Sequence, residues 1–198
     1  PFSFFFILNP AYVNQQKIGF EERFKLVAQK YVDFKKDEVF EKETNPVYFI
    51  YQISTKTQIF TGIVAGTSIE DYQQNTIKKH EDTLQYRVEL FKDYLDKTGF
   101  NTEPVLITYP DDPAIEQWIK SKISFPSLYE FSTTKREKHQ LWKIDQQDDI
   151  DWITQRFAQI DHLYIADGHH RSASAELLFE QDKESGNQNL KYFMSFLI

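Results

Sequence analysis

The strongest local pattern in this chain is an apolar strand that runs directly into a polar turn and then a helix. Residues 161–166 read Asp-His-Leu-Tyr-Ile-Ala, and their apolar and β-branched side chains predict a buried strand. Asp167-Gly168 then predicts a tight turn, and residues 172–180 predict a helix. Because so short a turn joins the strand to the helix, the two must pack together, which favours a fold that layers helices on a sheet.

The remaining segments mix strands and helices without strict alternation. Strands are predicted at residues 2–8, 47–54, 58–67, 104–108, 125–133, 140–144 and 192–198, and helices at residues 20–32, 69–97, 112–121 and 148–159. Ser68 predicts the N-cap of the long helix over residues 69–97, and Gly99 predicts its end. This order favours an α+β (mixed α/β) fold with one mixed sheet.

The length of 198 residues suits a single domain over residues 1–198. The chain opens at Pro1 inside one apolar run and closes inside another, at residues 192–198. A natural domain seldom stops within a strand, so we expect this domain to be the central part of a longer protein.

Composition excludes several functional classes. The chain carries 30 acidic and 23 basic residues and no cysteine. The acidic balance argues against a general nucleic-acid binder, which needs an excess of Lys and Arg. The lack of cysteine excludes a disulfide scaffold, a thiolate zinc site and a cysteine nucleophile. No apolar run approaches the roughly 20 residues of a membrane helix, so we expect no membrane partner. With nucleic acid also disfavoured, we expect the ligand to be a small molecule.

The turn after residue 166 carries residues that suit an anion. The first amides of a helix lack partners within it, and the helix dipole makes this end positive. Arg171 can grip a phosphate with two N–H groups, and Asp167 can cap the helix or hold Mg²⁺. The candidate phosphate-binding residues here are Gly168, His169, His170, Arg171 and Ser172. A plain capped turn or a metal site are the alternatives, although adjacent histidines make a poor zinc pair.

A second candidate cluster lies on the predicted long helix. Its apolar stripe comprises Ile77, Leu84, Val88, Phe91 and Leu95, and the spacing places Glu81 in the same stripe. A carboxylate on a core-facing row is costly unless it is paired or faces a cleft. Glu81 is therefore a candidate base or metal-contacting acid, with His80 and Lys78 as phosphate contacts. The alternative is a solvated helix face on which Glu81 pairs with a lysine.

Several segments resemble a known family. Tyr48-Phe-Ile-Tyr-Gln52, Gly62-Ile-Val-Ala65, Ile69-Glu-Asp-Tyr72, Ile77-Lys-Lys-His-Glu81, Leu141-Trp142 and Tyr164-Ile-Ala-Asp-Gly-His-His-Arg171 resemble, in that order, the bacterial and archaeal domain of unknown function 1015 family. This resemblance implies a cytoplasmic protein with a longer full form.

The segment from Asp167 to Arg171 is also similar to the phosphate-binding box of the ParB and sulfiredoxin superfamily, which includes free-serine kinases. Sulfiredoxin chemistry needs a cysteine, and ParB needs a basic DNA-binding module. This chain has neither, so the second resemblance implies nucleotide-dependent phosphoryl transfer or hydrolysis.

These observations favour a phosphotransferase that uses a nucleotide (ATP, ADP or CTP) and Mg²⁺ on a small hydroxyl compound, with free serine as a candidate, or a nucleotide hydrolase. In this hypothesis Asp167 assists Mg²⁺, Glu81 accepts the hydroxyl proton, and His80 or Lys78 stabilises the transferred charge. Two alternatives stay open. One is a non-catalytic nucleotide or metabolite sensor, and the other is a metal-dependent hydrolase with His80, His169, His170 and Asp167 as ligands. The oligomeric state is left open.

Overall fold

The computed structural model describes residues 4–10 and 18–198. The strands within these residues are β1 (Tyr48–Ser54), β2 (Ile59–Ser68), β3 (Ile77–Lys78), β4 (Val105–Thr108), β5 (Tyr129–Ser132), β6 (Lys138–Ile144), β7 (Leu163–Asp167) and β8 (Tyr192–Leu197). The helices are α1 (Phe4–Leu8), α2 (Phe20–Lys36), α3 (Ile69–Gln73), α4 (Gln85–Thr98), α5 (Pro113–Ile123), α6 (Gln147–Phe157) and α7 (His169–Gln181). Two short 3-10 helices, Lys183–Ser185 and Gln188–Lys191, connect α7 to β8.

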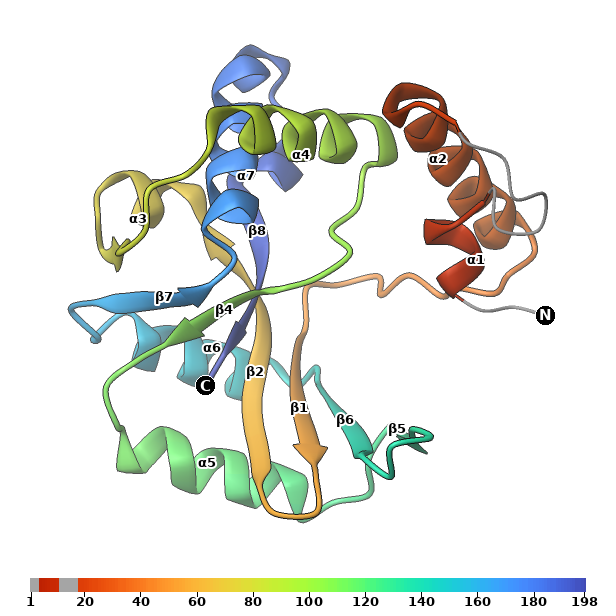
Figure 1. Ribbon diagram of the computed structural model, residues 1–198. Coiled ribbons are helices and arrows are strands. Elements are labelled where there is room, and N and C mark those ends of the chain that lie inside the picture. The colour runs from red at the N-terminus through yellow and green to blue at the C-terminus, as the bar shows by residue number, and fades with distance from the viewer. Residues whose placement is uncertain (1–3, 11–17) are drawn as a thin grey trace.

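All eight described strands join one mixed sheet, in the order β3-β7-β4-β8-β2-β1-β6-β5. β1 and β2 form the predicted hairpin, β8 pairs antiparallel with β2 and parallel with β4, and β3 pairs parallel with β7. Helices α4 and α7 lie together at one end of the molecule, with α2 beside α4, whereas α5 lies at the other end and α6 lies between the two ends (Figure 1). The predicted mixed α/β fold is therefore confirmed.

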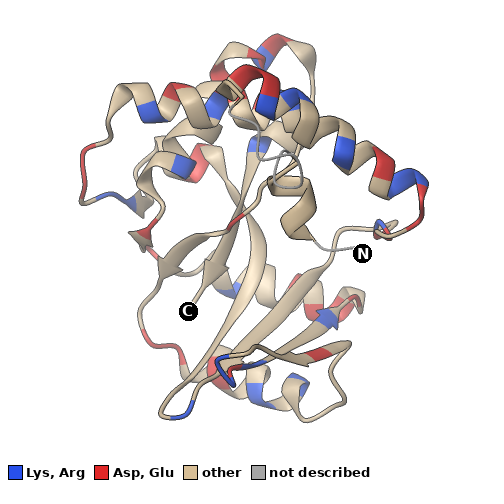
Figure 2. Ribbon diagram, turned by 45° about the vertical axis from the view of Figure 1, so that its right-hand side comes forward, with Lys and Arg blue, Asp and Glu red and all other residues tan. Residues whose placement is uncertain are grey.

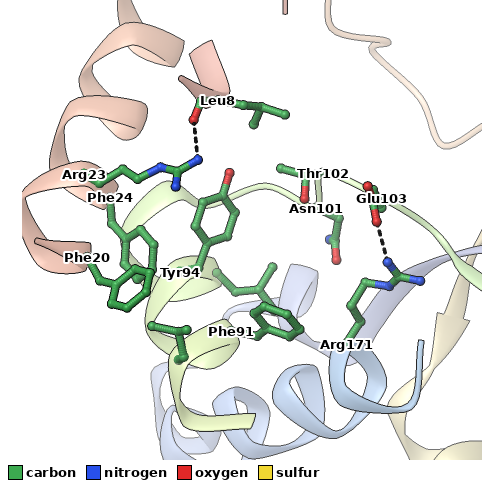
Figure 3. Close-up of a pocket in the computed structure, with 12 residues that line it drawn as sticks. Leu8, Phe20, Arg23, Phe24, Phe91, Tyr94, Asn101, Thr102, Glu103 and Arg171 are labelled. Atoms are coloured by element: carbon green, nitrogen blue, oxygen red, sulfur yellow. Dashed lines mark hydrogen bonds and ion pairs between the residues drawn. The ribbon is translucent and has the colours of Figure 1, made fainter. Parts of the chain in front are cut away.

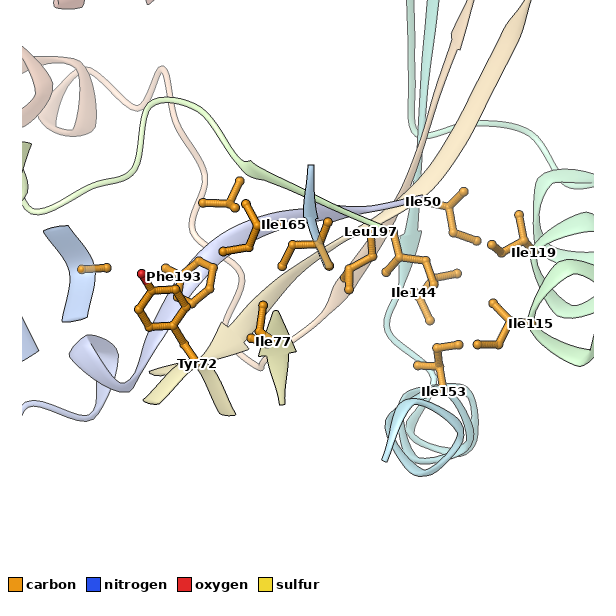
Figure 4. Close-up of a cluster of buried hydrophobic side chains, with 14 of the residues drawn as sticks. Ile50, Tyr72, Ile77, Ile115, Ile119, Ile144, Ile153, Ile165, Phe193 and Leu197 are labelled. Carbon is orange, nitrogen blue, oxygen red and sulfur yellow. The ribbon is translucent and has the colours of Figure 1, made fainter. Parts of the chain in front are cut away.

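The core follows the sheet from β3 to β6, whereas the edge strand β5 is exposed. Phe193 on β8 packs edge-on against Tyr72 of α3, while Ile115 of α5 and Ile153 of α6 close the opposite end (Figure 4). A smaller apolar cluster, built on Ile7, Val27 and Phe34, joins α1 to α2 and contacts Tyr94 and Phe100. The clusters meet the expectation that α-helices and a sheet each bury one apolar face.

The prediction of one long helix over residues 69–97 is wrong. The chain forms α3, the short strand β3 and only then α4, which begins at Gln85. Asn75 has a φ of 60°, a left-handed conformation that ends α3, and Ile77 pairs with Leu163 of β7. Ile77 is fully buried because it lies in the sheet, and Glu81 lies in the segment after β3. The Glu81 side chain is 62% exposed, so its predicted place on a core-facing helix row is also wrong.

The strand predicted at residues 2–8 is also wrong where the structure describes it. Residues 4–8 form α1, and residues 2 and 3 lie outside the described residues. Ile7 buries its side chain against α2 and not in the sheet. An apolar run this short fits either element, and the neighbouring helix decides between them.

Other local signals match the structure. Ser68 accepts hydrogen bonds from the amides of residues 70 and 71 and so caps α3. Gly99 ends α4 with a left-handed φ of 72°, and Asp112 caps α5 just before Pro113. The predicted strand, turn and helix near residue 167 are β7, Gly168 and α7, although α7 begins at His169 and not near residue 172.

Charged residues of both signs are interspersed along the helices, and the long central strands carry few of either (Figure 2). This distribution fits strands whose side chains are taken up largely by the core. Over residues 4–10 and 18–198, no helix has the length and apolar character needed to cross a bilayer.

Candidate functional site

The site is organised by Gly168, which joins β7 to α7. Its φ of 99° is open to glycine and strained for other residues, and an added Cβ would lie 2.9 Å from the Nε and Nη2 atoms of Arg171. The carbonyl of Gly168 accepts the first helical hydrogen bonds, from the amides of Arg171 (2.9 Å) and Ser172 (3.1 Å). Among the described side chains, none caps α7. The start of this 13-residue helix therefore keeps amides and a positive dipole end available to an anion.

Two adjacent histidines bring the second cluster to this helix. Nε2 of His169 accepts a hydrogen bond from the backbone N–H of His80 (3.4 Å), and Nε2 of His170 accepts one from the backbone N–H of Leu84 (3.1 Å). The segment between β3 and α4, residues 79–84, is thus held at both ends by the first turn of α7. The predicted donors of hydrogen bonds to phosphate are here acceptors of backbone N–H groups.

His169 is nearly fully buried, with 3% of its surface exposed, and it faces Glu81. Burial, reinforced by the neighbouring His80, lowers the pKa of His169, although Glu81 and Asp167 act in the opposite direction. In the tautomer that lets Nε2 accept this bond the proton is on Nδ1, which lies 3.5 Å from a carboxylate oxygen of Glu81. The His80 ring meets the His169 ring edge-on at 4.5 Å between centroids.

A cavity of about 490 Å³ opens beside this group. Its lining includes Lys79, Glu81, Asp82, His169 and Glu176. The Nζ atom of Lys79 lies 3.5 Å from the centre of the Tyr72 ring, which holds that charge at the wall of the cavity. The cavity thus combines imidazoles, carboxylates and one cation in a space large enough for a small polar ligand.

Arg171 forms contacts of a different kind. Its Nη1 and Nη2 atoms each lie 2.5 Å from a carboxylate oxygen, the first of Glu103 and the second of Asp167. Figure 3 shows Arg171 paired with Glu103 at one end of a cavity of about 330 Å³, whose walls include Phe91 and Tyr94. The structure therefore pairs Asp167 with Arg171 and pairs Glu81 with His169.

The other predicted site residues have less exposed positions. Ser172 is fully buried, and its hydroxyl donates to the carbonyl of His169, so it faces the helix and not the solvent. Lys78 lies in β3, in register with Tyr164 of β7, and is half-buried. The seven other predicted site residues all lie in the first turn of α7, directly before it or against His169, but they do not all face one cavity.

Sequence reasoning missed Glu103, which pairs with Arg171, and Glu176, which lines the cavity beside Glu81. Glu103 lies in the loop before β4, where no motif or periodicity marks it. Glu176 follows His169 by two turns of α7, so helical periodicity combined with the histidine box could have indicated it.

The comparisons with known proteins bear on the family. Searches of the curated proteins and of the solved structures gave no significant match. The local resemblance to the ParB and sulfiredoxin superfamily is not confirmed. The family model described as "Protein of unknown function (DUF1015)" matches residues 1–198, the whole chain. Since this match covers every segment that suggested the resemblance, the chain belongs to the DUF1015 family.

Proposed function

We propose that this chain binds a nucleotide together with Mg²⁺ at the start of α7 and catalyses phosphoryl transfer from it. The observation that carries the proposal is the uncapped start of α7, which has Arg171 on one side and the Glu81–His169 pair on the other. A phosphate at this position would accept hydrogen bonds from the first amides of the helix and gain from its dipole.

The pairing of Arg171 supports a site that binds Mg²⁺ and phosphate together. The Asp167 carboxylate that holds Nη2 of Arg171 is 72% exposed and is an oxygen ligand of the kind that Mg²⁺ prefers. A Mg²⁺ ion bound to Asp167 would free the edge of the Arg171 guanidinium that Asp167 now holds. That edge could then donate two parallel N–H bonds to a phosphate. Glu103 would keep the other end of Arg171 in place.

Glu81 supplies the chemistry at the acceptor. The sequence left two roles open for this carboxylate, a base and a metal-contacting acid, and both act on the hydroxyl of the acceptor. A base removes the hydroxyl proton directly, and a bound metal ion lowers the pKa of that hydroxyl. The cavity of about 490 Å³ beside Glu81 suits a small acceptor, with free serine as a candidate.

The test is calorimetric titration of ATP, ADP and CTP into the chain with Mg²⁺, followed by a product assay on free serine. We expect one of the three to bind, and Arg171→Ala to weaken its binding by about 10- to 100-fold because it removes a charge-assisted contact. Arg87→Ala is a matched control, since the Arg87 side chain contacts only its neighbour Tyr86 in the described contacts.

Absence of binding by all three nucleotides would overturn the proposal. Binding without turnover on any small hydroxyl compound would leave the alternative of a nucleotide sensor. Equal losses in Arg171→Ala and Arg87→Ala would remove Arg171 from the site.

A further inference from the structure

We propose that His80, Glu81 and His169 form a binding site for one divalent transition-metal ion of the Zn²⁺ class. This site is distinct from the predicted Mg²⁺ position at Asp167. The ion can bind whether or not the chain catalyses the proposed phosphoryl transfer. Only a role of the ion in that reaction rests on the proposed function.

The spacing of the donor atoms fits an ion better than a hydrogen bond. One donor atom from each of the three residues lies within 4.8 Å of the other two, and among the described residues this is the one such group of three His, Asp or Glu side chains. Nδ1 of His169 and the Glu81 oxygen are 3.5 Å apart, beyond the normal hydrogen-bond range of about 2.7–3.2 Å. Two ligands of a tetrahedral ion with bonds of about 2.1 Å lie about 3.4 Å apart.

The site is held in place before any ion binds. Only 3% of the His169 surface is exposed, so the packing around α7 fixes its ring. The backbone of residues 79–84 is held by the hydrogen bond from the Leu84 N–H to His170, which ion binding leaves in place. An ion on Nδ1 of His169 takes the position of the ring proton, which moves to Nε2, so the longer bond from the His80 N–H is given up when the ion binds. His80 and Glu81 are both exposed, so their side chains can rotate toward an ion without disturbing the core.

The ligand types select the class of metal. Two imidazoles and one carboxylate suit Zn²⁺ and its transition-metal neighbours, whereas Mg²⁺ prefers oxygen ligands alone. Three protein ligands leave at least one position open, which is the pattern of catalytic and not of structural zinc sites. The open position would face the cavity of about 490 Å³, where Asp82 and Glu176 add negative charge.

This ligand set differs from the one that the sequence suggested. His170 uses its Nε2 on the backbone N–H of Leu84, and Asp167 is paired with Arg171. Glu81 takes their place beside His80 and His169. In the proposed transfer reaction, Glu81 is then the metal-contacting acid and not the base.

The experiment titrates Zn²⁺ into chelator-treated chain that is produced without a histidine tag. Calorimetry gives the stoichiometry, and visible absorption of bound Co²⁺ reports nitrogen ligation independently. We expect one ion per chain, and we expect His80→Ala and Glu81→Gln each to weaken binding by about tenfold or more. Both residues are exposed, so both variants should keep the thermal unfolding curve of the metal-free chain.

Asp161→Asn and His162→Ala are the matched controls. Asp161 and His162 are an exposed carboxylate and an exposed histidine that precede β7, outside the cavity. We expect both controls to bind Zn²⁺ as the unaltered chain does. No uptake of Zn²⁺ or Co²⁺ by the unaltered chain, or equal losses in the test variants and the controls, would overturn the site.

The titrations contain no nucleotide, so the two proposals fail separately. Zn²⁺ binding that survives Arg171→Ala, in a chain that binds no nucleotide, would support the metal site and reject the phosphate proposal. Nucleotide binding in a chain that takes up no Zn²⁺ or Co²⁺ would do the reverse.

Discussion

Replacing Gly168 by alanine should destabilise the chain through two separate effects. The φ of 99° places the residue in the left-handed half of conformational space, where a Cβ costs about 1–2 kcal/mol. The new Cβ would also lie 2.9 Å from Nε and Nη2 of Arg171, so the guanidinium must shift. Its partners Asp167 and Glu103 are more than two-thirds exposed, so the ion pairs that this shift weakens are worth at most about 1 kcal/mol.

The two effects together predict a loss of about 1–3 kcal/mol in the free energy of unfolding, measured by urea denaturation. Gly99→Ala is the matched control, because Gly99 has a φ of 72° and nothing lies within 4 Å of the added Cβ. In Gly99→Ala the free energy of unfolding should fall only by the conformational cost of about 1–2 kcal/mol. The reasoning is refuted if Gly168→Ala stays within about 0.5 kcal/mol of the unaltered chain. An equal loss in the two variants would show that Arg171 moves aside without cost.

Three further predictions concern the elements around the site. Ile77→Ala should cost about 2–4 kcal/mol in urea denaturation, because Ile77 is fully buried in β3 and its loss leaves a cavity; a cost below about 1 kcal/mol would contradict this placement. Asp112→Ala should cost about 1–2 kcal/mol, since Asp112 caps α5 and pairs with Arg156. Burial tends to raise the pKa of Asp112, but the hydrogen bonds from Arg156 and two α5 amides lower this pKa overall. The stabilisation is therefore present above the pKa of the unfolded carboxyl and is lost as the pH falls through the pKa of the folded one. We expect the stability of Asp112→Ala to fall less steeply with pH in that range. His170→Ala should speed amide hydrogen exchange at Leu84 by removing its acceptor, and unchanged exchange there would contradict that bond.

Local signals were enough to predict much of this fold. The β1–β2 hairpin has β-branched and aromatic strands on either side of a polar turn, and α5 has the Asp-Pro start that caps it. The order of strand, turn and helix around Gly168 was predictable because an apolar run, a glycine and polar residues follow one another, although α7 begins at His169 and not near residue 172.

The error over residues 69–97 has a physical cause. The spacing of apolar residues suits a helix, but Ile77 gains more from pairing with Leu163 in β7, a contact between distant parts of the chain. Local spacing carries no information on such a partner. For the same reason Glu103 could not be assigned to Arg171. Glu81 was chosen as a site candidate from a wrong argument about its position, and the structure places it 3.5 Å from His169.

The place of β8 in the sheet has a consequence for how the chain is made. β8 is the last described strand to leave the ribosome, yet it lies between β4 and β2 and joins the two halves of the sheet. Until it arrives, the nascent chain holds two open strand edges at its centre, which are sites for pairing with other chains. Cellular yield should therefore depend on how quickly residues 192–197 are added and on chaperones that shield those edges meanwhile.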